Sequence, residues 1–319
     1  MSNQQKVKVL VQVPCLNEEG TLESVLKSIP KHIPNVDIKL LVIDDGSKDR
    51  TVEIANQCGV HHIIRHARNQ GLGRSFHDGA QLALHLGVDI LVNTDGDNQY
   101  PQDRIPDLIQ PIIDGNADMV IADRQTATIQ HFSYGKKLLQ KWGSHVVNNA
   151  AGTNVPDAAS GFRAYSREAL IQLNTITRFS YTMETIIQAG NKRLAITSVP
   201  VKTNAKTRES RLFRSTHEHV YKSALAIIRA YLMYKPYVLF VNAGILFLLL
   251  GLVPFVRFLF FVTHPNGAHH LQSLIAGSVL LTISLISFAL AIIADLVRIN
   301  RVLLENQLEI SKRHYTNFD

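Results

Sequence analysis

Two long apolar stretches in the last third of the chain restrict its fold more than any other feature. Residues 237–262 contain one charged side chain, Arg257, near one end, and residues 274–294 contain none. Each stretch is long enough to cross the hydrocarbon core of a bilayer as a helix. Two such stretches in succession, rich in Leu, Phe and Gly, are atypical of buried helices in a water-soluble domain. The sequence therefore predicts two transmembrane helices joined to a separate domain that precedes them.

The basic residues around the two stretches predict their orientation. The connecting loop, near residues 263–272, has no Lys or Arg, whereas Lys and Arg flank both outer ends. By the positive-inside rule, we expect the loop outside the cell membrane and both termini in the cytoplasm. The net charge of +7 suits a protein at an anionic membrane surface better than one that binds nucleic acid. The expected parts are a cytoplasmic domain (1–215), an amphipathic interfacial helix (216–235), two transmembrane helices (236–297) and a cytoplasmic helix or tail (298–319).

Apolar runs and helical patterns alternate through residues 1–215. This alternation predicts an α/β fold with a mostly parallel, Rossmann-like sheet. The glycines around Gly71 lack the spacing of a dinucleotide-binding fingerprint, and the sequence has no Gly-Lys-Ser/Thr phosphate loop. Strands are expected at residues 7–13, 38–43, 63–64, 90–92, 119–122 and 194–203, and helices near residues 21–29, 51–57, 69–86, 134–150, 167–173 and 182–189.

Two aspartates follow the apolar run at residues 90–92. Asp95 and Asp97 stand one residue apart, and Gln99 follows them. We expect this loop at the carboxyl end of a strand, where open α/β sheets bind ligands. Two carboxylates and an amide oxygen suit Mg²⁺ or Mn²⁺, which keep free positions for water and for phosphates. The alternative is an ordinary turn rich in Asp and Asn, and the triplet by itself does not decide between the two interpretations.

Five short motifs occur in order between residues 14 and 163. They are Pro14-Cys15-Leu16-Asn17-Glu18-Glu19, Asp44-Asp45-Gly46-Ser47, Asn69-Gln70-Gly71-Leu72-Gly73, Asp95-Gly96-Asp97-Asn98-Gln99-Tyr100-Pro101 and Ser160-Gly161-Phe162-Arg163. In their order and spacing, these motifs resemble the inverting family 2 glycosyltransferases, which have the GT-A fold. Within that family, residues 7–215 are similar to polyprenyl-phosphate glycosyltransferases related to dolichol-phosphate mannose synthase. The two apolar stretches that follow resemble the bacterial branch that loads sugar onto undecaprenyl phosphate.

The resemblance implies a role for individual residues. Asp95 and Asp97 match the metal-binding acidic pair, with Asp95 also beside the nucleotide, and Gln99 matches an amide that completes the metal's shell. One departure is that Pro156 stands where many relatives carry a basic residue, so phosphate binding is expected to depend more on Arg124, Arg163 and the loop at 206–214. The implied nucleotide contacts are Pro14, Asn17, Glu18 and Asp45, and the implied contacts to the acceptor's phosphate or lipid are Arg124, Ser160, Arg163, Lys206, Arg208 and Arg211.

The residue types also fit the chemistry of sugar transfer between two anions. A divalent cation held by Asp95 and Asp97 would neutralise the leaving diphosphate. A lipid phosphate is already anionic at neutral pH, so a strong general base is not required. The site must instead hold two anionic groups in line, which arginines such as Arg124 do well. Asp157 is the carboxylate we expect nearest the reaction centre, so the expected catalytic residues are Asp157, Asp97 and Arg124, and direct displacement predicts inversion.

Other functions stay open from the sequence. The same two aspartates would suit a membrane-bound metal-dependent nucleotidyltransferase or phosphoryltransferase, and a non-catalytic membrane partner could keep the fold. Two apolar stretches are too few to expect a polymer-conducting synthase. The expected donor is UDP-glucose, with GDP-mannose or another nucleotide sugar as the alternative, in glycosylation of the cell envelope. The expected partners are therefore a nucleotide sugar, a polyprenyl phosphate, the bilayer and further copies of the chain in a dimer or tetramer.

Overall fold

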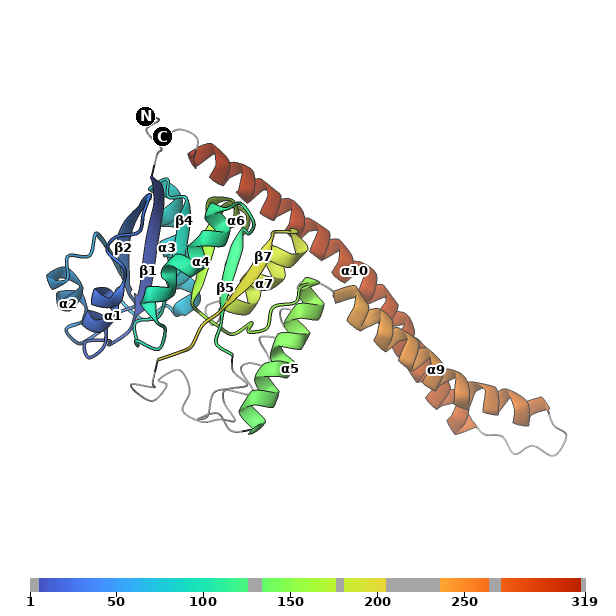
Figure 1. Ribbon diagram of the computed structural model, residues 1–319. Helices are drawn as coiled ribbons and strands as arrows, with labels where there is room; N and C mark the ends of the chain where they lie inside the picture. The colour runs from blue at the N-terminus through green and yellow to red at the C-terminus, as the bar shows by residue number, and fades with distance from the viewer. Residues whose placement is uncertain (1–5, 126–133, 176–180, 205–235, 264–270, 317–319) are drawn as a thin grey trace. The chain divides into compact units, whose positions relative to one another are not determined.

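The computed structural model describes residues 6–125, 134–175, 181–204, 236–263 and 271–316. The chain divides into two compact units (Figure 1). The first consists of Met1–Ala230 and Gln307–Asp319, and the second consists of Tyr231–Asn306. The first unit contains the domain that the sequence predicts to be catalytic, so it is called the catalytic unit below. The last residues of the chain therefore belong with the first 230, although the sequence predicts a separate tail after residue 297.

Within the described residues, one sheet of seven strands forms the centre of the catalytic unit. Its order is β3-β2-β1-β4-β6-β5-β7. Neighbouring strands are parallel except that β6 runs antiparallel to both β4 and β5. The expected mostly parallel sheet is confirmed, but β6 was not predicted. The strands are β1 (Val7–Cys15), β2 (Val36–Asp44), β3 (His62–Arg65), β4 (Ile90–Asn93), β5 (Met119–Asp123), β6 (Arg163–Ser166) and β7 (Ile196–Pro200).

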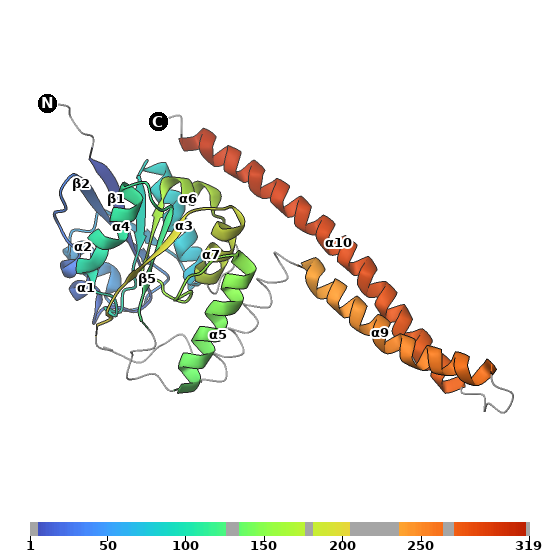
Figure 2. The same cartoon turned by 45° about the vertical axis from the view of Figure 1, so that its right-hand side comes forward.

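Helices cover both faces of this sheet because successive strand side chains point to opposite sides. On one face, Val9, Val11 and Val13 of β1 form a buried core with α1, α2 and α4. On the other face, α3 and α6 pack against the sheet and each other, and α7 packs against α3 (Figures 1 and 2). The helices are α1 (Leu22–Ser28), α2 (Thr51–Gln57), α3 (Leu72–His85), η1 (Gln102–Arg104), α4 (Ile105–Ile113), α5 (Tyr134–Ala151), α6 (Arg167–Gln172) and α7 (Tyr181–Asn191).

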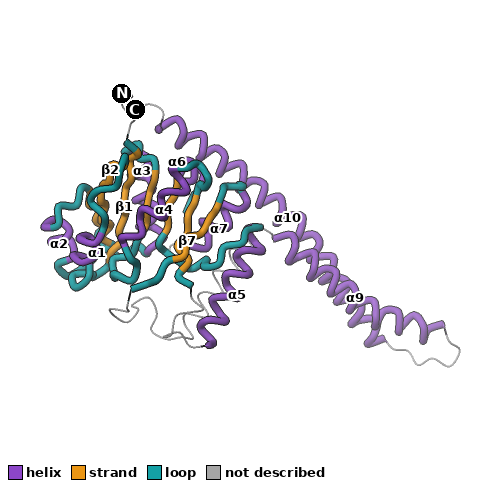
Figure 3. Tube along the Cα trace, in the orientation of Figure 1, coloured by secondary structure: helices purple, strands orange, loops and turns teal. Residues whose placement is uncertain are grey.

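The direction of the strands brings five loops to one edge of the sheet. The loops after β1, β2, β3, β4 and β5 leave from the carboxyl ends of strands that point the same way. Because β6 is antiparallel, the residues before it also reach this edge, where Arg163 is in register with Asn93 of β4. The loops are teal at the lower ends of the strands in Figure 3. All five sequence motifs therefore lie at this edge, with the other four around the Asp95–Asp97 loop.

The second unit is a hairpin of two apolar helices, α9 (Pro236–Thr263) and the first part of α10 (Leu271–Thr316). Both are long and apolar enough to cross a membrane. In the most apolar 18-residue stretch of each helix, only 6% and 17%, respectively, is buried within the protein. They pack closely at small residues. A Cβ atom on Gly244 would lie 2.8 Å from the Phe288 ring, and the Ser284 hydroxyl donates to the Gly244 carbonyl at 2.8 Å. Contacts of this kind are typical of helix pairs in membranes.

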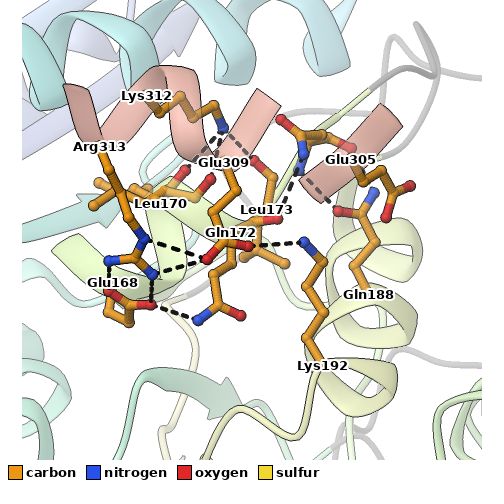
Figure 4. Close-up of polar contacts among 12 residues, drawn as sticks. Glu168, Leu170, Gln172, Leu173, Gln188, Lys192, Glu305, Glu309, Lys312 and Arg313 are labelled. Carbon is orange, nitrogen blue, oxygen red and sulfur yellow. Dashed lines mark hydrogen bonds and ion pairs between the residues drawn. The ribbon is translucent and has the colours of Figure 1, made fainter. Parts of the chain in front are cut away.

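The C-terminal end of α10 docks on α6 within the catalytic unit (Figure 4). The Lys312 ammonium donates to the carbonyls of Leu170, Ile171 and Leu173 at 3.1, 3.1 and 2.8 Å. Carbonyls at the end of a helix lack partners within the helix, so Lys312 acts as a cap supplied by a distant segment. Arg313 adds an ion pair with Glu168, at 2.9 Å from Nη1 to Oε2.

Candidate active site

The loop after β4 is held by hydrogen bonds from Thr21 on one side and Gln102 on the other. Thr21 Oγ1 donates to the Gly96 carbonyl at 2.7 Å, and Gln102 Nε2 donates to Thr94 Oγ1 at 2.8 Å. A Cβ atom on Gly96 would lie 3.0 Å from Cys15 Sγ and 3.3 Å from Glu18 Cγ. Glycine is therefore needed here so that the loops after β1 and β4 can approach each other.

The carboxylates of this loop form an unfavourable cluster unless a cation is present. Burial, followed by the neighbouring Asp97 carboxylate, raises the pKa of Asp95 from 3.8 to about 7, and Glu18 acts in the same direction. Glu18 is buried and comes from the loop after β1. A divalent cation between Asp95 and Asp97 would remove the repulsion, so these residues fit Mg²⁺ or Mn²⁺.

The number of protein ligands also suits a cation shared with substrate. In the described ranges, no group of three or more His, Cys, Asp or Glu side chains is arranged to hold a metal ion. Two carboxylates would leave the remaining positions to water and phosphate oxygens, as Mg²⁺ prefers in phosphate sites. The expected third ligand, Gln99, uses its backbone N–H to donate to Asp97 Oδ1 at 3.1 Å. That hydrogen bond orients Asp97.

The expected nucleotide contacts Pro14, Asn17 and Glu18 lie in the loop after β1, beside the loop after β2. Asn17 has a left-handed backbone with φ of 56°. Its N–H donates to Ser47 Oγ at 2.8 Å, and its Oδ1 accepts from the Lys48 N–H at 2.8 Å. The Glu18 N–H donates to Thr51 Oγ1 at 2.8 Å, which ties the same loop to the start of α2. The structure therefore brings these motifs together at the expected edge.

Asp45 connects the loop after β2 to the segment that begins α3. Its Oδ1 accepts from the Gln70 N–H at 2.8 Å and its Oδ2 accepts from the Gly71 N–H at 2.9 Å. Its Oδ1 also lies 2.7 Å from His66 Nδ1, and His66 Nε2 lies 3.0 Å from Asp78 Oδ2. Asp45 thus holds the start of α3, and the nucleotide contact implied by resemblance stays a prediction. The sequence analysis did not identify His66, although its place directly after β3 was a usable signal.

Arg124 and Asp157 meet at the opposite side of the site. Arg124 Nε donates to Asp157 Oδ2 at 2.6 Å, and Arg124 Nη2 donates to Asp157 Oδ1 at 2.9 Å. Asp157 also accepts from the backbone N–H of Arg124 and of Ala159, at 3.3 Å each. The carboxylate is 4% exposed. Asp157 therefore orients Arg124, and the direct role in catalysis expected of Asp157 stays a prediction.

Ser160 and Arg163 are the expected phosphate contacts just before and at the start of β6. Both are fully buried. Arg163 donates to the carbonyls of Ser160, Thr182 and Ala158 at 2.7, 2.8 and 2.8 Å, and to Thr185 Oγ1 at 3.0 Å. In this arrangement Arg163 connects α7 to the loop before β6. The expectation that it compensates for the basic residue missing at Pro156 stays a prediction.

Gly161, between these two residues, lies directly against Asp95 in the loop after β4. A Cβ atom on Gly161 would lie 3.2 and 3.3 Å from the two carboxylate oxygens of Asp95. The Gly161 N–H donates to the Tyr100 hydroxyl at 3.0 Å, and its carbonyl accepts from Asn93 Nδ2 at 2.8 Å. Asn93 in turn accepts from Gln12 Nε2 at 2.9 Å. The sequence analysis missed this support, although polar Gln12 and Asn93 in otherwise apolar strands were a signal.

Lys206, Arg208 and Arg211 lie outside the described residues, as does the predicted interfacial helix at 216–235. Their roles stay predictions.

Comparisons with known proteins agree with this geometry. Residues 10–173 match the model of Glycosyl transferase family 2. The chain belongs to this family. The UDP-N-acetylglucosamine–dolichyl-phosphate N-acetylglucosaminyltransferase of Methanococcus voltae is 30% identical over 212 residues, which cover 60% of this chain and 83% of the relative. The polyprenol monophosphomannose synthase of Mycolicibacterium smegmatis is 26% identical over 205 residues, which cover 61% of this chain and 76% of the relative.

Comparison with solved structures confirms the GT-A fold of the catalytic unit. Glucosyl-3-phosphoglycerate synthase from Mycobacterium tuberculosis, solved with Mn²⁺, UDP-glucose and phosphoglyceric acid, aligns with a TM-score of 0.54 and 25% identity. The alignment covers 69% of this family 2 glycosyltransferase and 79% of that chain. The same enzyme has been solved with Mg²⁺ and UDP.

Proposed function

We propose that this family 2 glycosyltransferase transfers a hexose from a UDP-hexose to a polyprenyl phosphate, with a divalent cation. The observation that carries the proposal is the Asp95–Asp97 pair at the ligand-binding edge of a GT-A sheet, where burial and Asp97 raise the pKa of Asp95 to about 7. When bound there, Mg²⁺ or Mn²⁺ would act as a Lewis acid on the diphosphate leaving group. The direct displacement inverts the configuration at the sugar's anomeric carbon.

The named relatives support the choice of substrates. The name of the Methanococcus relative contains a UDP-sugar donor and dolichyl phosphate, and that of the Mycolicibacterium relative contains a polyprenol monophosphate product. The structural neighbour was solved with UDP-glucose. We therefore favour a UDP-hexose, with UDP-glucose as the first donor to test and GDP-mannose as the alternative.

The two apolar helices support an acceptor that is dissolved in a membrane. Polyprenyl phosphate has a long apolar chain and a phosphate at the membrane surface, so a membrane-anchored enzyme meets it directly. The proposed topology places the catalytic unit, both termini and the reaction on the cytoplasmic side, because the loop at 263–272 has no Lys or Arg. Assembly into a dimer or tetramer stays a prediction.

Some of these side chains would bind charged groups of the substrates, and others would position the loops around them. Asp157 orients the Arg124 guanidinium through their ion pair, and Arg124 is the cation that would bind the acceptor phosphate. Asp95 and Asp97 would hold the cation that binds the donor's diphosphate. The loops at Asn17 and Asp45 would form the wall beside the nucleotide. The lipid phosphate supplies its own negative charge as nucleophile, so the chain needs no strong general base.

Transfer of radiolabel into lipid tests this function. The protein in detergent, with undecaprenyl phosphate and Mn²⁺ or Mg²⁺, is offered UDP-glucose, other UDP-hexoses and GDP-mannose. We expect label in the lipid phase from one donor, release of the nucleoside diphosphate and loss of both with Asp97→Asn. The matched control is Asp103→Asn, an exposed aspartate nearby. Release of pyrophosphate would indicate a nucleotidyltransferase, and a product that retains the donor's anomeric configuration would contradict direct displacement.

A further inference from the structure

We infer that Asn204 is a positioning residue for the metal-binding loop and that it sets the loop's affinity for the divalent cation. The inference rests on the proposed function, because it assigns Asn204 to the Asp95–Asp97 site. Asn204 is 107 residues away from Asp97 in the sequence, beyond β7, and belongs to none of the motifs.

Asn204 makes hydrogen bonds to three successive carbonyls of the metal loop. Its Nδ2 donates to the Asn98 carbonyl at 3.0 Å and to the Tyr100 carbonyl at 3.3 Å. Its backbone N–H donates to the Gln99 carbonyl at 2.9 Å. The segment before it is also fixed, because the Val201 N–H donates to the Asp123 carbonyl at 2.8 Å. The end of β5 and the metal loop are thus connected through residues 201–204.

One of these carbonyls belongs to the peptide group that orients Asp97. The carbonyl of Asn98 and the N–H of Gln99 are the two ends of a single planar peptide unit. The N–H end donates to Asp97 Oδ1 at 3.1 Å, and the carbonyl end accepts from Asn204 Nδ2 at 3.0 Å. Fixing one end of a rigid, planar group fixes the direction of the other. Hydrogen bonds in such a chain also polarise one another.

The backbone of this peptide unit needs support. Asn98 adopts a left-handed conformation with φ of 59°. Residues other than glycine adopt this conformation only at a cost, and asparagine is among the most tolerant. The amide of Asn204 stabilises the carbonyl of that residue, so the loop keeps the shape in which Asp97 faces Asp95.

An amide at position 204 suits this role and a carboxylate does not. An ionised aspartate accepts hydrogen bonds but cannot donate them, so it would place negative charge against two carbonyl oxygens. Asn204 is exposed, so its replacement leaves no buried cavity, and its backbone bond to Gln99 survives any substitution except proline. Loss of the side chain should therefore change the metal loop while the fold is kept.

Mn²⁺ binding in the absence of donor and acceptor tests the inference. The measurement is electron paramagnetic resonance of free Mn²⁺ titrated with the full-length protein in detergent. We expect Asn204→Ala to weaken Mn²⁺ binding by about three- to tenfold, which corresponds to the loss of one or two ordinary hydrogen bonds. Asn204→Asp should weaken it at least as much. The matched control, Asn116→Ala, replaces an exposed asparagine far from the site and should bind as the unchanged protein does.

Kinetics separate positioning from a general loss of structure. With Asn204→Ala, we expect a higher Mn²⁺ concentration for half-maximal transfer, a kcat close to that of the unchanged protein at saturating Mn²⁺ and an unaltered Tm in EDTA. Unchanged Mn²⁺ binding in Asn204→Ala, or a kcat that saturating Mn²⁺ does not restore, would overturn the inference. Altered Mn²⁺ binding without sugar transfer by the unchanged protein would support the inference while contradicting the proposed function. A complete lack of Mn²⁺ binding by the unchanged protein would contradict both.

Discussion

Arg124 and Asp157 form a two-point ion pair in which each partner's orientation depends on the other. The pair is mostly buried, with Arg124 16% and Asp157 4% exposed, and joins the end of β5 to the loop before β6. Removing one partner leaves the other charge buried and unpaired, which is costly.

Substitutions at this pair separate its structural and catalytic roles. We expect Asp157→Ala to lower the free energy of unfolding by about 3 kcal/mol, because Arg124 loses its partner. Replacing both residues, as Arg124→Met with Asp157→Leu, should recover most of that stability without recovering activity. Thermal midpoints and sugar transfer by the three proteins provide the measurement. Full activity in the double variant would show that Arg124 has no part in catalysis.

Gly161→Ala tests the close approach of the loop before β6 to the Asp95 carboxylate. The added methyl group would lie 3.2 to 3.3 Å from the Asp95 carboxylate oxygens, so the carboxylate must move. We expect kcat/KM to fall by about tenfold or more, equivalent to at least about 1.4 kcal/mol, with little change in Tm. Gly20→Ala is the control, because a Cβ atom there meets nothing within 4 Å. An equal effect in both variants would argue against the proposed contact.

Metal removal should make the stability of the protein depend on pH. The pKa of Asp95 is about 7 in the fold and 3.8 ordinarily, so the folded chain binds more protons between these values. Its stability in EDTA should therefore fall as pH rises from about 4 to 7. Mn²⁺ should reverse that loss, and Asp97→Asn should reduce it because the repelling charge is gone. Thermal midpoints across this range, with and without Mn²⁺, are the measurement, and identical pH profiles for the two proteins would contradict the repulsion.

Lys312→Met should destabilise the catalytic unit by about 1–3 kcal/mol, because three carbonyls at the end of α6 lose their donor. The control is Lys31→Met, at an exposed position. Thermal unfolding in detergent compares the variants. A variant as stable as the control would show that water replaces Lys312 at these carbonyls without cost.

The same lysine predicts a pH dependence in the alkaline range. Burial, followed by Lys192 just after α7, lowers the pKa of Lys312 from 10.5 to about 8, although Glu309 of α10 raises it. His77 of α3 also lies near Lys312. Between pH 8 and 10.5 the unfolded chain binds more protons, so stability should rise with pH through this window. Lys312→Met should lack the rise, which a pH series of thermal midpoints detects.

The sequence predicts the strands with strong apolar patterns and misses those whose pairing is decided at long range. β6 has the sequence Arg-Ala-Tyr-Ser, which has little strand signal, and it forms because β4 and β5 pair with it on both sides. α4 was missed because Pro106 and Pro111 argue against a helix. Pro106 is tolerated in the first turn, where the missing N–H has no helical partner, and Pro111 lies near the end.

For the candidate site, the sequence predicts the location of the residues better than the direction of their side chains. Asp95 and Asp97 lie where the end of an apolar strand predicts. Arg124 and Arg163 look alike as phosphate contacts in the sequence, yet only Arg163 is enclosed by carbonyls. Two of its partners, Thr182 and Thr185, lie about 20 residues away on α7, and no local pattern reveals that packing.

The docking of residues 307–316 on α6 has a consequence for the order of folding. A ribosome synthesises these residues after both apolar helices, although they complete the catalytic unit. Domains generally fold as units during synthesis, from the N-terminus onward. Here Lys312 and Arg313, which belong to the catalytic unit, follow both apolar helices in the sequence. We therefore expect the finished catalytic unit to form only after translation has passed the second helix, which links maturation of the enzyme to its insertion.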